Sequence, residues 1–90
     1  MTPYTLDTTL DTAMAMPLRL ELLSRLDARQ PMMLEGADVA RVGLACLQVL
    51  ASARAAAIAD GLPFVINSPS AALREMAALA RLDAVLEAAG

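Results

Sequence analysis

Polar and apolar residues alternate over the first segment of the chain. Tyr4, Leu6, Thr8 and Leu10 fall on one side of a two-residue repeat, and mostly polar residues fall on the other. This period predicts one strand with a wet face, at or near the edge of a sheet.

A period of about four residues follows and predicts an amphipathic helix that ends near residue 28. Asp11 and Thr12 are both residue types that cap helices well. Leu18, Leu22 and Leu26 recur every four residues and form the predicted buried stripe. Pro17 leaves two alternatives: the helix begins near residue 13 and lacks one hydrogen bond at Pro17, or its regular part begins with Pro17 in the first turn.

Two short apolar runs predict the remaining strands. Met32–Leu34 and Phe64–Ile66 are unbroken, and each follows a proline, which costs least at the start of a strand. Unbroken apolar strands are typical of a sheet covered on both faces, so we expect both runs to be inner strands.

Helical spacing returns after each of these two runs. The second helix is expected from about residue 43 to residue 60, with Gly61 as its C-terminal stop. Its predicted buried side holds Cys46, Leu47, Leu50, Ala53, Ala57 and Ile58, and its outer side holds Leu44, Gln48, Ser52, Ala55 and Ala59, none of them charged. The third helix is expected after Ser68 as N-cap and Pro69 in the first turn, and Asp83 is expected to cap a last short helix or turn through Val85 and Leu86.

The order β-α-β-α-β-α predicts the α/β class, with a small, mostly parallel sheet joined by right-handed crossovers and covered by helices. The 90 residues predict one domain, residues 1–90.

Composition narrows the function. The formal charge of −3 argues against nucleic acid as a partner. The chain has one cysteine and no histidine, so we expect neither a disulfide nor a metal site. It shows no signal peptide and no apolar run of membrane-spanning length, and we therefore expect a cytoplasmic protein that does not insert into a membrane.

The segment from Met32 to Leu50 resembles the signature region of STAS domains, the fold of anti-sigma-factor antagonists. That family shows an apolar strand, a loop, and then Asp-Ser/Thr-Ser/Ala-Gly-Leu opening an apolar helix. The matching run here is Gly43-Leu44-Ala45-Cys46-Leu47, and the ending SPSAALREMAALARLDAVL also resembles the family's closing pattern. The order of apolar strand, loop and apolar helix matches the family, whereas the acidic and hydroxyl residues of the signature are absent.

The resemblance implies a docking module whose partners meet the start of the second helix. The residues so implied are Asp38, Arg41, Val42, Gly43, Leu44 and Gln48. Leu44 occupies the position of the phosphorylated Ser or Thr, so this chain is not expected to be switched by phosphate there. For Val42, burial in the core and contact with a partner are both open, whereas Leu44 faces away from the predicted buried stripe.

Catalysis is the competing class, and the residues disfavour it. The chain lacks histidine, lysine and a glycine-rich phosphate loop. Glu35 and Asp38 are interpreted as solvated loop acids or helix caps, and Cys46 as a small buried residue. We therefore expect no enzyme and no cofactor.

The run GLACLQVLASAR most resembles short stand-alone STAS proteins of alphaproteobacterial chemotaxis gene clusters. The resemblance implies a bacterial protein as partner: a signalling kinase, a chemotaxis component or a transporter ATPase. The STAS subunit of a phospholipid-transport ABC complex and a degenerate anti-sigma-factor antagonist are the alternatives.

Overall fold

A computed structural model describes residues 3–89, so the ends of the predicted domain, residues 1–2 and 90, lie outside the described residues. Within that part the elements are β1 (Tyr4–Thr5), β2 (Thr9–Leu10), α1 (Thr12–Asp27), β3 (Met32–Glu35), β4 (Arg41–Val42), α2 (Leu44–Ala59), β5 (Phe64–Asn67), α3 (Ala71–Leu79) and the 3-10 helix η1 (Asp83–Leu86).

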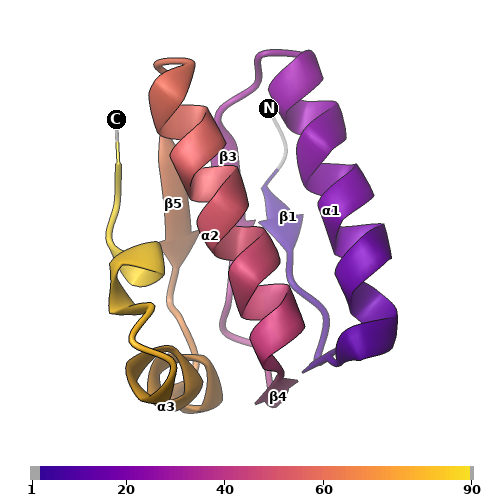
Figure 1. Ribbon diagram of the computed structural model, residues 1–90, viewed down its shortest axis with the longest axis vertical. Coiled ribbons are helices and arrows are strands. Elements are labelled where there is room, and N and C mark those ends of the chain that lie inside the picture. The colour runs from indigo at the N-terminus through magenta and orange to yellow at the C-terminus, as the bar shows by residue number, and fades with distance from the viewer. Residues whose placement is uncertain (1–2, 90) are drawn as a thin grey trace.

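The main sheet has the strand order β1-β3-β5, and both pairings are parallel. Met32 lies opposite Phe64 and Leu34 opposite Ile66, and all four side chains are buried beneath the helices. The predicted α/β class with a mostly parallel sheet is confirmed (Figure 1).

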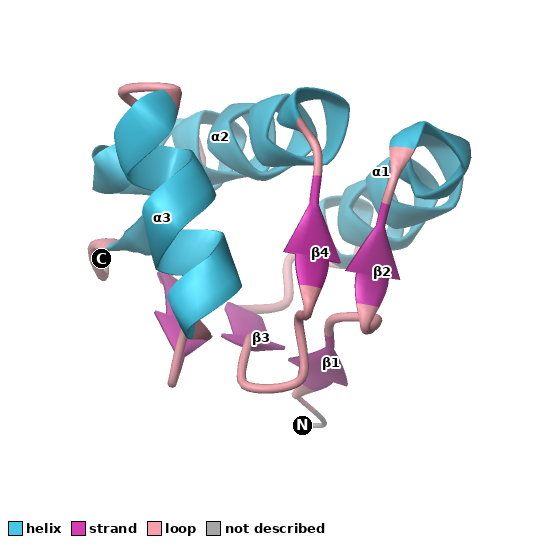
Figure 2. Cartoon of the chain, turned by 90° about the horizontal axis from the view of Figure 1, so that it is seen from below, coloured by secondary structure: helices cyan, strands magenta, loops and turns pink. Residues whose placement is uncertain are grey.

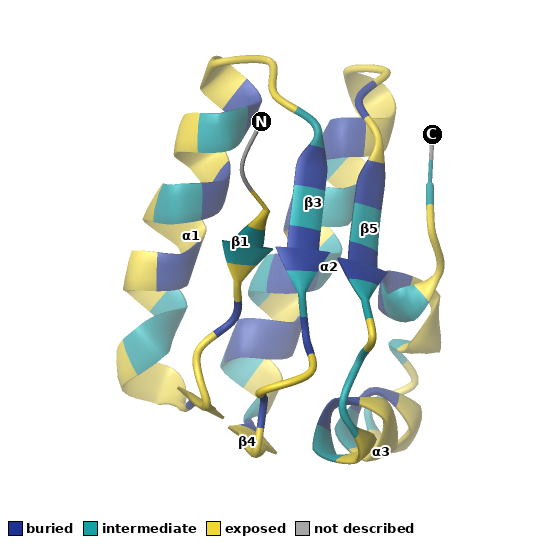
Figure 3. Ribbon diagram, turned by 180° about the vertical axis from the view of Figure 1, so that it is seen from behind, coloured by how far each residue is buried: buried dark blue, intermediate teal, exposed yellow. Residues whose placement is uncertain are grey.

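Only one face of this sheet is covered by the two long helices. Helices α1 and α2 pack side by side behind the strands, while α3 lies beyond the end of β5 (Figure 3). Met33, Glu35, Val65 and Asn67 point to the other face and are half-buried. The prediction that these strands are covered on both faces was therefore wrong. Each strand has only two residues that face the core, Met32 and Leu34 in β3 and Phe64 and Ile66 in β5.

Strand β5 is the last strand of the main sheet and not an inner strand as predicted. Its outer edge makes an antiparallel bridge, in which Phe64 and Ala89 exchange backbone hydrogen bonds of 2.9 and 2.8 Å. Phe64 is fully buried even so, because the helices cover its side chain. The apolar run therefore predicted correctly that the side chains are buried, but it did not predict the position of the strand in the sheet.

The predicted first strand is divided in two. The Leu6 N–H still donates to the Glu35 carbonyl, 2.9 Å away, but the chain then leaves the main sheet. Thr9 and Leu10 instead pair in parallel with Arg41 and Val42 as the sheet β2-β4. Leu6 and Leu10 are buried as the alternation predicts, whereas Thr8 is exposed at the break.

Helix α1 begins at Thr12, so Pro17 lies inside it and the first of the two alternatives is correct. The buried residues of α1 are Leu18, Leu22 and Leu26, as predicted. Asp11 occupies the N-cap position without a side-chain hydrogen bond.

The later helices follow their predicted ranges with three corrections. Ile58 is exposed, because the last turn of α2 extends beyond the start of β5 (Figure 3). The cap of α3 is Ser70, whose hydroxyl accepts from the Leu73 N–H at 3.1 Å, and not Ser68, whose φ is 50°. Asp83 is the first residue of η1 and makes no capping hydrogen bond. Gly61 ends α2 with φ of 70°, the left-handed conformation that glycine favours.

Candidate functional site

The loop between β3 and α2 is fixed at its start by Gly36. The Gly36 N–H donates to the Asn67 carbonyl, and its own carbonyl accepts from the Ser70 N–H. A Cβ at this position would lie only 2.9 Å from Cγ2 of Ile66 and 3.3 Å from Cα of Pro69. Glycine is therefore required by the close approach of the β5–α3 connection, and not by a turn as such.

Three backbone hydrogen bonds hold the second half of the loop against the segment before α1. The N–H groups of Ala40 and Arg41 both donate to the Thr8 carbonyl, at 2.8 and 3.1 Å. The Gly43 N–H donates to the Leu10 carbonyl at 2.9 Å. Strands β2 and β4 consequently lie side by side and lead into the starts of α1 and α2 (Figure 2).

The two side chains of β4 point in opposite directions. Val42 is 9% exposed and belongs to the core, which resolves the alternative left open for it. Arg41 points to solvent. Asp38 is exposed in the loop, and Val39 beside it is buried.

Helix α2 begins without a side-chain cap. Gly43 is the N-cap residue, with an extended φ of −100°, and no acidic residue lies in the first turn. Leu44, the first helical residue, is 51% exposed, and Gln48 is exposed one turn later. Gly43 is half-buried, and a Cβ there would be 3.7 Å from the Leu10 carbonyl oxygen, an ordinary contact distance.

Five of the six residues singled out from the sequence therefore lie together on one end of the molecule. We call them the tip surface: Asp38, Arg41, Gly43, Leu44 and Gln48. Beyond the tip surface, further along α2, Ser52, Ala55 and Ala59 are also exposed and uncharged. Val42 lies beneath it and supports it from the core.

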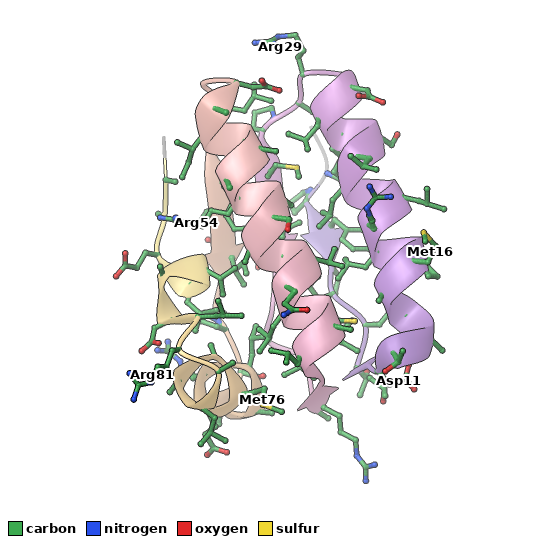
Figure 4. The ribbon with its side chains drawn as sticks, viewed as in Figure 1. Asp11, Met16, Arg29, Arg54, Met76 and Arg81 are labelled. Atoms are coloured by element: carbon green, nitrogen blue, oxygen red, sulfur yellow. The ribbon has the colours of Figure 1, made fainter. Side chains whose placement is uncertain are left out.

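A cleft beside the tip surface is a feature that the sequence did not reveal. It lies between β4 and α3, has a volume of about 290 Å³, and is lined by Ala40, Arg41, Val42, Ala72, Glu75, Met76 and Leu79. Met76 lies at the lower end of the molecule (Figure 4). Leu79, at the end of α3, is 81% exposed at the margin of the cleft.

The thiol in α2 is unsuited to nucleophilic chemistry. Cys46 is fully buried, and its Sγ donates to the Asp11 carbonyl at 3.2 Å. Burial, and secondly the Asp11 carboxylate, raise the pKa of the Cys46 thiol above its ordinary value. A reactive cysteine needs a lowered pKa and exposure, so the interpretation of Cys46 as a small core residue fits its surroundings.

Acidic groups near the loop do not gather into a site either. Glu35 is half-buried at the end of β3, and Asp38 is exposed. Across residues 3–89 no cluster of three or more His, Cys, Asp or Glu side chains is arranged to hold a metal ion. What the tip surface offers is an apolar side chain, an uncharged helix face and charges at its margin.

Comparison with known proteins gives one match. The family model described as "Mlab, STAS domain" matches residues 5–87. No curated protein and no solved structure matches the chain. None of the helices within residues 3–89 has both the length and the apolar character needed to cross a membrane.

Proposed function

Because this chain belongs to the STAS domain family, we propose that it is a non-catalytic docking module whose partner protein binds the tip surface. The observation that carries the proposal is Leu44, an apolar side chain half exposed at the start of a helix whose outer face has no charge. Interfaces favour apolar, charge-depleted centres with polar rims. Asp38 and Arg41 supply such a rim.

The environment of Gly43 supports docking at the same place. The backbone conformation does not require glycine, and the interior leaves room for a Cβ. A partner that approaches the backbone at the start of α2 would give glycine a role there that the fold does not.

The partner is a component of a bacterial signalling assembly in the cytoplasm, and specifically of a chemotaxis system. The resemblance of the run GLACLQVLASAR to chemotaxis-associated STAS proteins supports this assignment. Docking is independent of phosphorylation, because leucine at position 44 has no hydroxyl to accept phosphate. A transporter ATPase captured in place of a signalling protein would overturn the assignment to signalling but not the docking surface.

Leu44→Asp tests the surface. The variant should fold normally, because Leu44 is half exposed and a carboxylate in a first helical turn contributes about 0.3–1 kcal/mol of stabilisation. Binding should be lost, because the new carboxylate would be desolvated without a partner at the contact. Affinity capture of the partner from the source bacterium, identified by mass spectrometry, is measured beside a thermal melt.

Ala55→Asp is the matched control, since it adds the same charge on the same exposed helix face about 16 Å further along α2. Capture by Ala55→Asp but not by Leu44→Asp, with similar melts, supports the tip surface. Equal capture by both variants would place the interface elsewhere. A collapsed melt for Leu44→Asp would show that Leu44 stabilises the fold.

A further inference from the structure

Strand β4 pairs with β2 along one edge only, and its other edge faces α3 (Figure 2). On the paired edge the Arg41 N–H donates to the Thr8 carbonyl. Further along the same edge the Gly43 N–H donates to the Leu10 carbonyl. The backbone groups of successive residues in a strand point alternately to its two edges. The N–H and C=O of Val42, the residue between Arg41 and Gly43, therefore point away from β2 and toward α3.

These two groups of Val42 have no partner in the part of the chain that the structure describes. Val42 is 9% exposed, and neither its N–H nor its C=O makes a hydrogen bond with another residue between 3 and 89. Buried backbone donors and acceptors are nearly always hydrogen-bonded. An unbonded donor and acceptor together at the edge of a strand are the groups to which a further strand bonds.

The cleft between β4 and α3 separates this unpaired edge from a helix face. Val42 lines the cleft from β4. The residues that line it from α3 are spaced as one helical face requires, namely Ala72, Glu75, Met76 and Leu79. A groove between an unpaired strand edge and a helix face suits an extended peptide, because the peptide backbone bonds to the strand while its side chains contact the helix.

We propose that this cleft binds an extended segment of the partner protein, which adds as a third strand to the sheet of β2 and β4. One residue of that segment exchanges two backbone hydrogen bonds with Val42, as Ala89 does with Phe64 at the edge of the main sheet. The inference deepens the proposed function and rests on it, because Arg41 belongs both to the tip surface and to the wall of the cleft.

The walls of the cleft define the side chains that the segment carries. Met76 and Leu79 offer apolar contacts, and Ala72 leaves room between α3 and β4. Arg41 on one wall and Glu75 on the other are exposed, and among the described residues neither forms an ion pair. An apolar side chain flanked by a carboxylate for Arg41 and a cation for Glu75 complements this cleft. A partner helix would fill the same volume but leave the backbone of Val42 unbonded, since helical backbone groups bond within the helix.

Peptides selected from a random phage-displayed library against the whole protein test the proposal. Enriched peptides are synthesised, and their dissociation constants are measured by isothermal titration calorimetry. Methylation of the one peptide nitrogen that donates to the Val42 carbonyl should weaken binding at least about tenfold, because a buried acceptor is left unbonded. Methylation of the next nitrogen, which points away from β4, is the matched control and should leave binding nearly unchanged.

A pair of protein variants tests the place of binding. Ala72→Phe fills the cleft from the α3 wall and should abolish peptide binding. Ala78→Phe is the matched control, because Ala78 is exposed on the same helix and does not line the cleft. It should bind the peptides as the wild type does. Thermal melts of both variants are recorded, and the methylated peptides test the strand pairing on the wild-type protein whatever the fold of Ala72→Phe.

Three results would overturn the proposal. A library that yields no binding peptide shows that the cleft does not take an extended segment. Peptides that bind a folded Ala72→Phe variant as well as the wild type use a different surface. Peptides that tolerate methylation at every nitrogen do not pair with the strand edge. Because the peptides replace the cellular partner, each of these failures is distinct from retention of that partner by Leu44→Asp, which would refute the tip surface.

Discussion

Replacement of Gly36 by alanine tests whether close packing or chain flexibility fixes the start of the loop between β3 and α2. The added Cβ would lie 2.9 Å from Cγ2 of Ile66, 3.2 Å from Cδ2 of Leu73 and 3.3 Å from Cα of Pro69. Ile66 and Leu73 are buried in the core, and Ile66 is β-branched, so its rotation is restricted. The third contact is with the backbone of Pro69, which cannot move away as a flexible side chain could.

The expected loss follows from two opposing effects. Overpacking of a well-packed interior costs about 1–3 kcal/mol. Loss of conformational freedom in the unfolded chain stabilises the alanine variant by about 0.4–1 kcal/mol. The net free energy of unfolding should therefore fall by about 1–2 kcal/mol, which lowers the melting temperature of a domain of this size by roughly 4–16 °C.

Gly43→Ala is the matched control, because the same substitution there meets only the Leu10 carbonyl oxygen at 3.7 Å with φ of −100°. Alanine is a poorer N-cap than glycine but restricts the unfolded chain, so the net change should stay within about 1 kcal/mol. Urea unfolding followed by circular dichroism compares both variants with the wild type. Equal stability of the two variants would refute the packing explanation for Gly36.

Three further predictions concern the core, a helix cap and the thiol. Leu47→Ala or Leu50→Ala, each at a fully buried position of α2, should cost about 2–5 kcal/mol in urea unfolding, and a loss below about 1 kcal/mol would contradict their burial. Ser70→Ala removes the acceptor of the Leu73 N–H and should cost about 0.5–2 kcal/mol, whereas Ser52→Ala, at an exposed helical position, should cost almost nothing. The pKa of Cys46 is raised by folding, so its contribution to stability is complete below the ordinary thiol pKa of about 8.5 and is lost as the pH rises through the folded pKa. Unfolding measured from neutral to alkaline pH should show that loss, and a Cys46→Ala variant should show a shallower decline.

Periodic patterns in the sequence correctly predicted the features that depend on residues close together in the chain. The four-residue repeat of Leu18, Leu22 and Leu26 identified the buried face of α1, and alternation with two apolar runs identified the parallel α/β class. The errors concern features that depend on contacts between residues far apart in the sequence. Phe64–Ile66 looks like an inner strand because its side chains are buried, yet strand order depends on pairing partners that periodicity does not report.

Exposure at the tip surface was predicted from the sequence more completely than the packing around it. Leu44 and Gln48 were identified as exposed, because a helical phase places them opposite the buried stripe of α2. Burial of Val42 by the β2-β4 pairing was one of two alternatives that the sequence left open, because Arg41-Val42 is too short to show a period. The cleft against α3 was missed, because its lining residues come from separate elements.

The pairing of β2 with β4 explains how the start of α2 can lack the acidic and hydroxyl residues of the family signature and still keep the fold. Thr8 and Leu10 hold the loop through backbone carbonyls, so those hydrogen bonds do not depend on which side chains the loop carries. Val39 and Val42 anchor it in the core, whereas the side chains of Ala40, Arg41 and Leu44 are exposed. The exposed positions can therefore change while the backbone at the start of α2 stays in place. Leucine at position 44 then alters the chemistry of the exposed tip surface, and the scaffold beneath it remains that of the family.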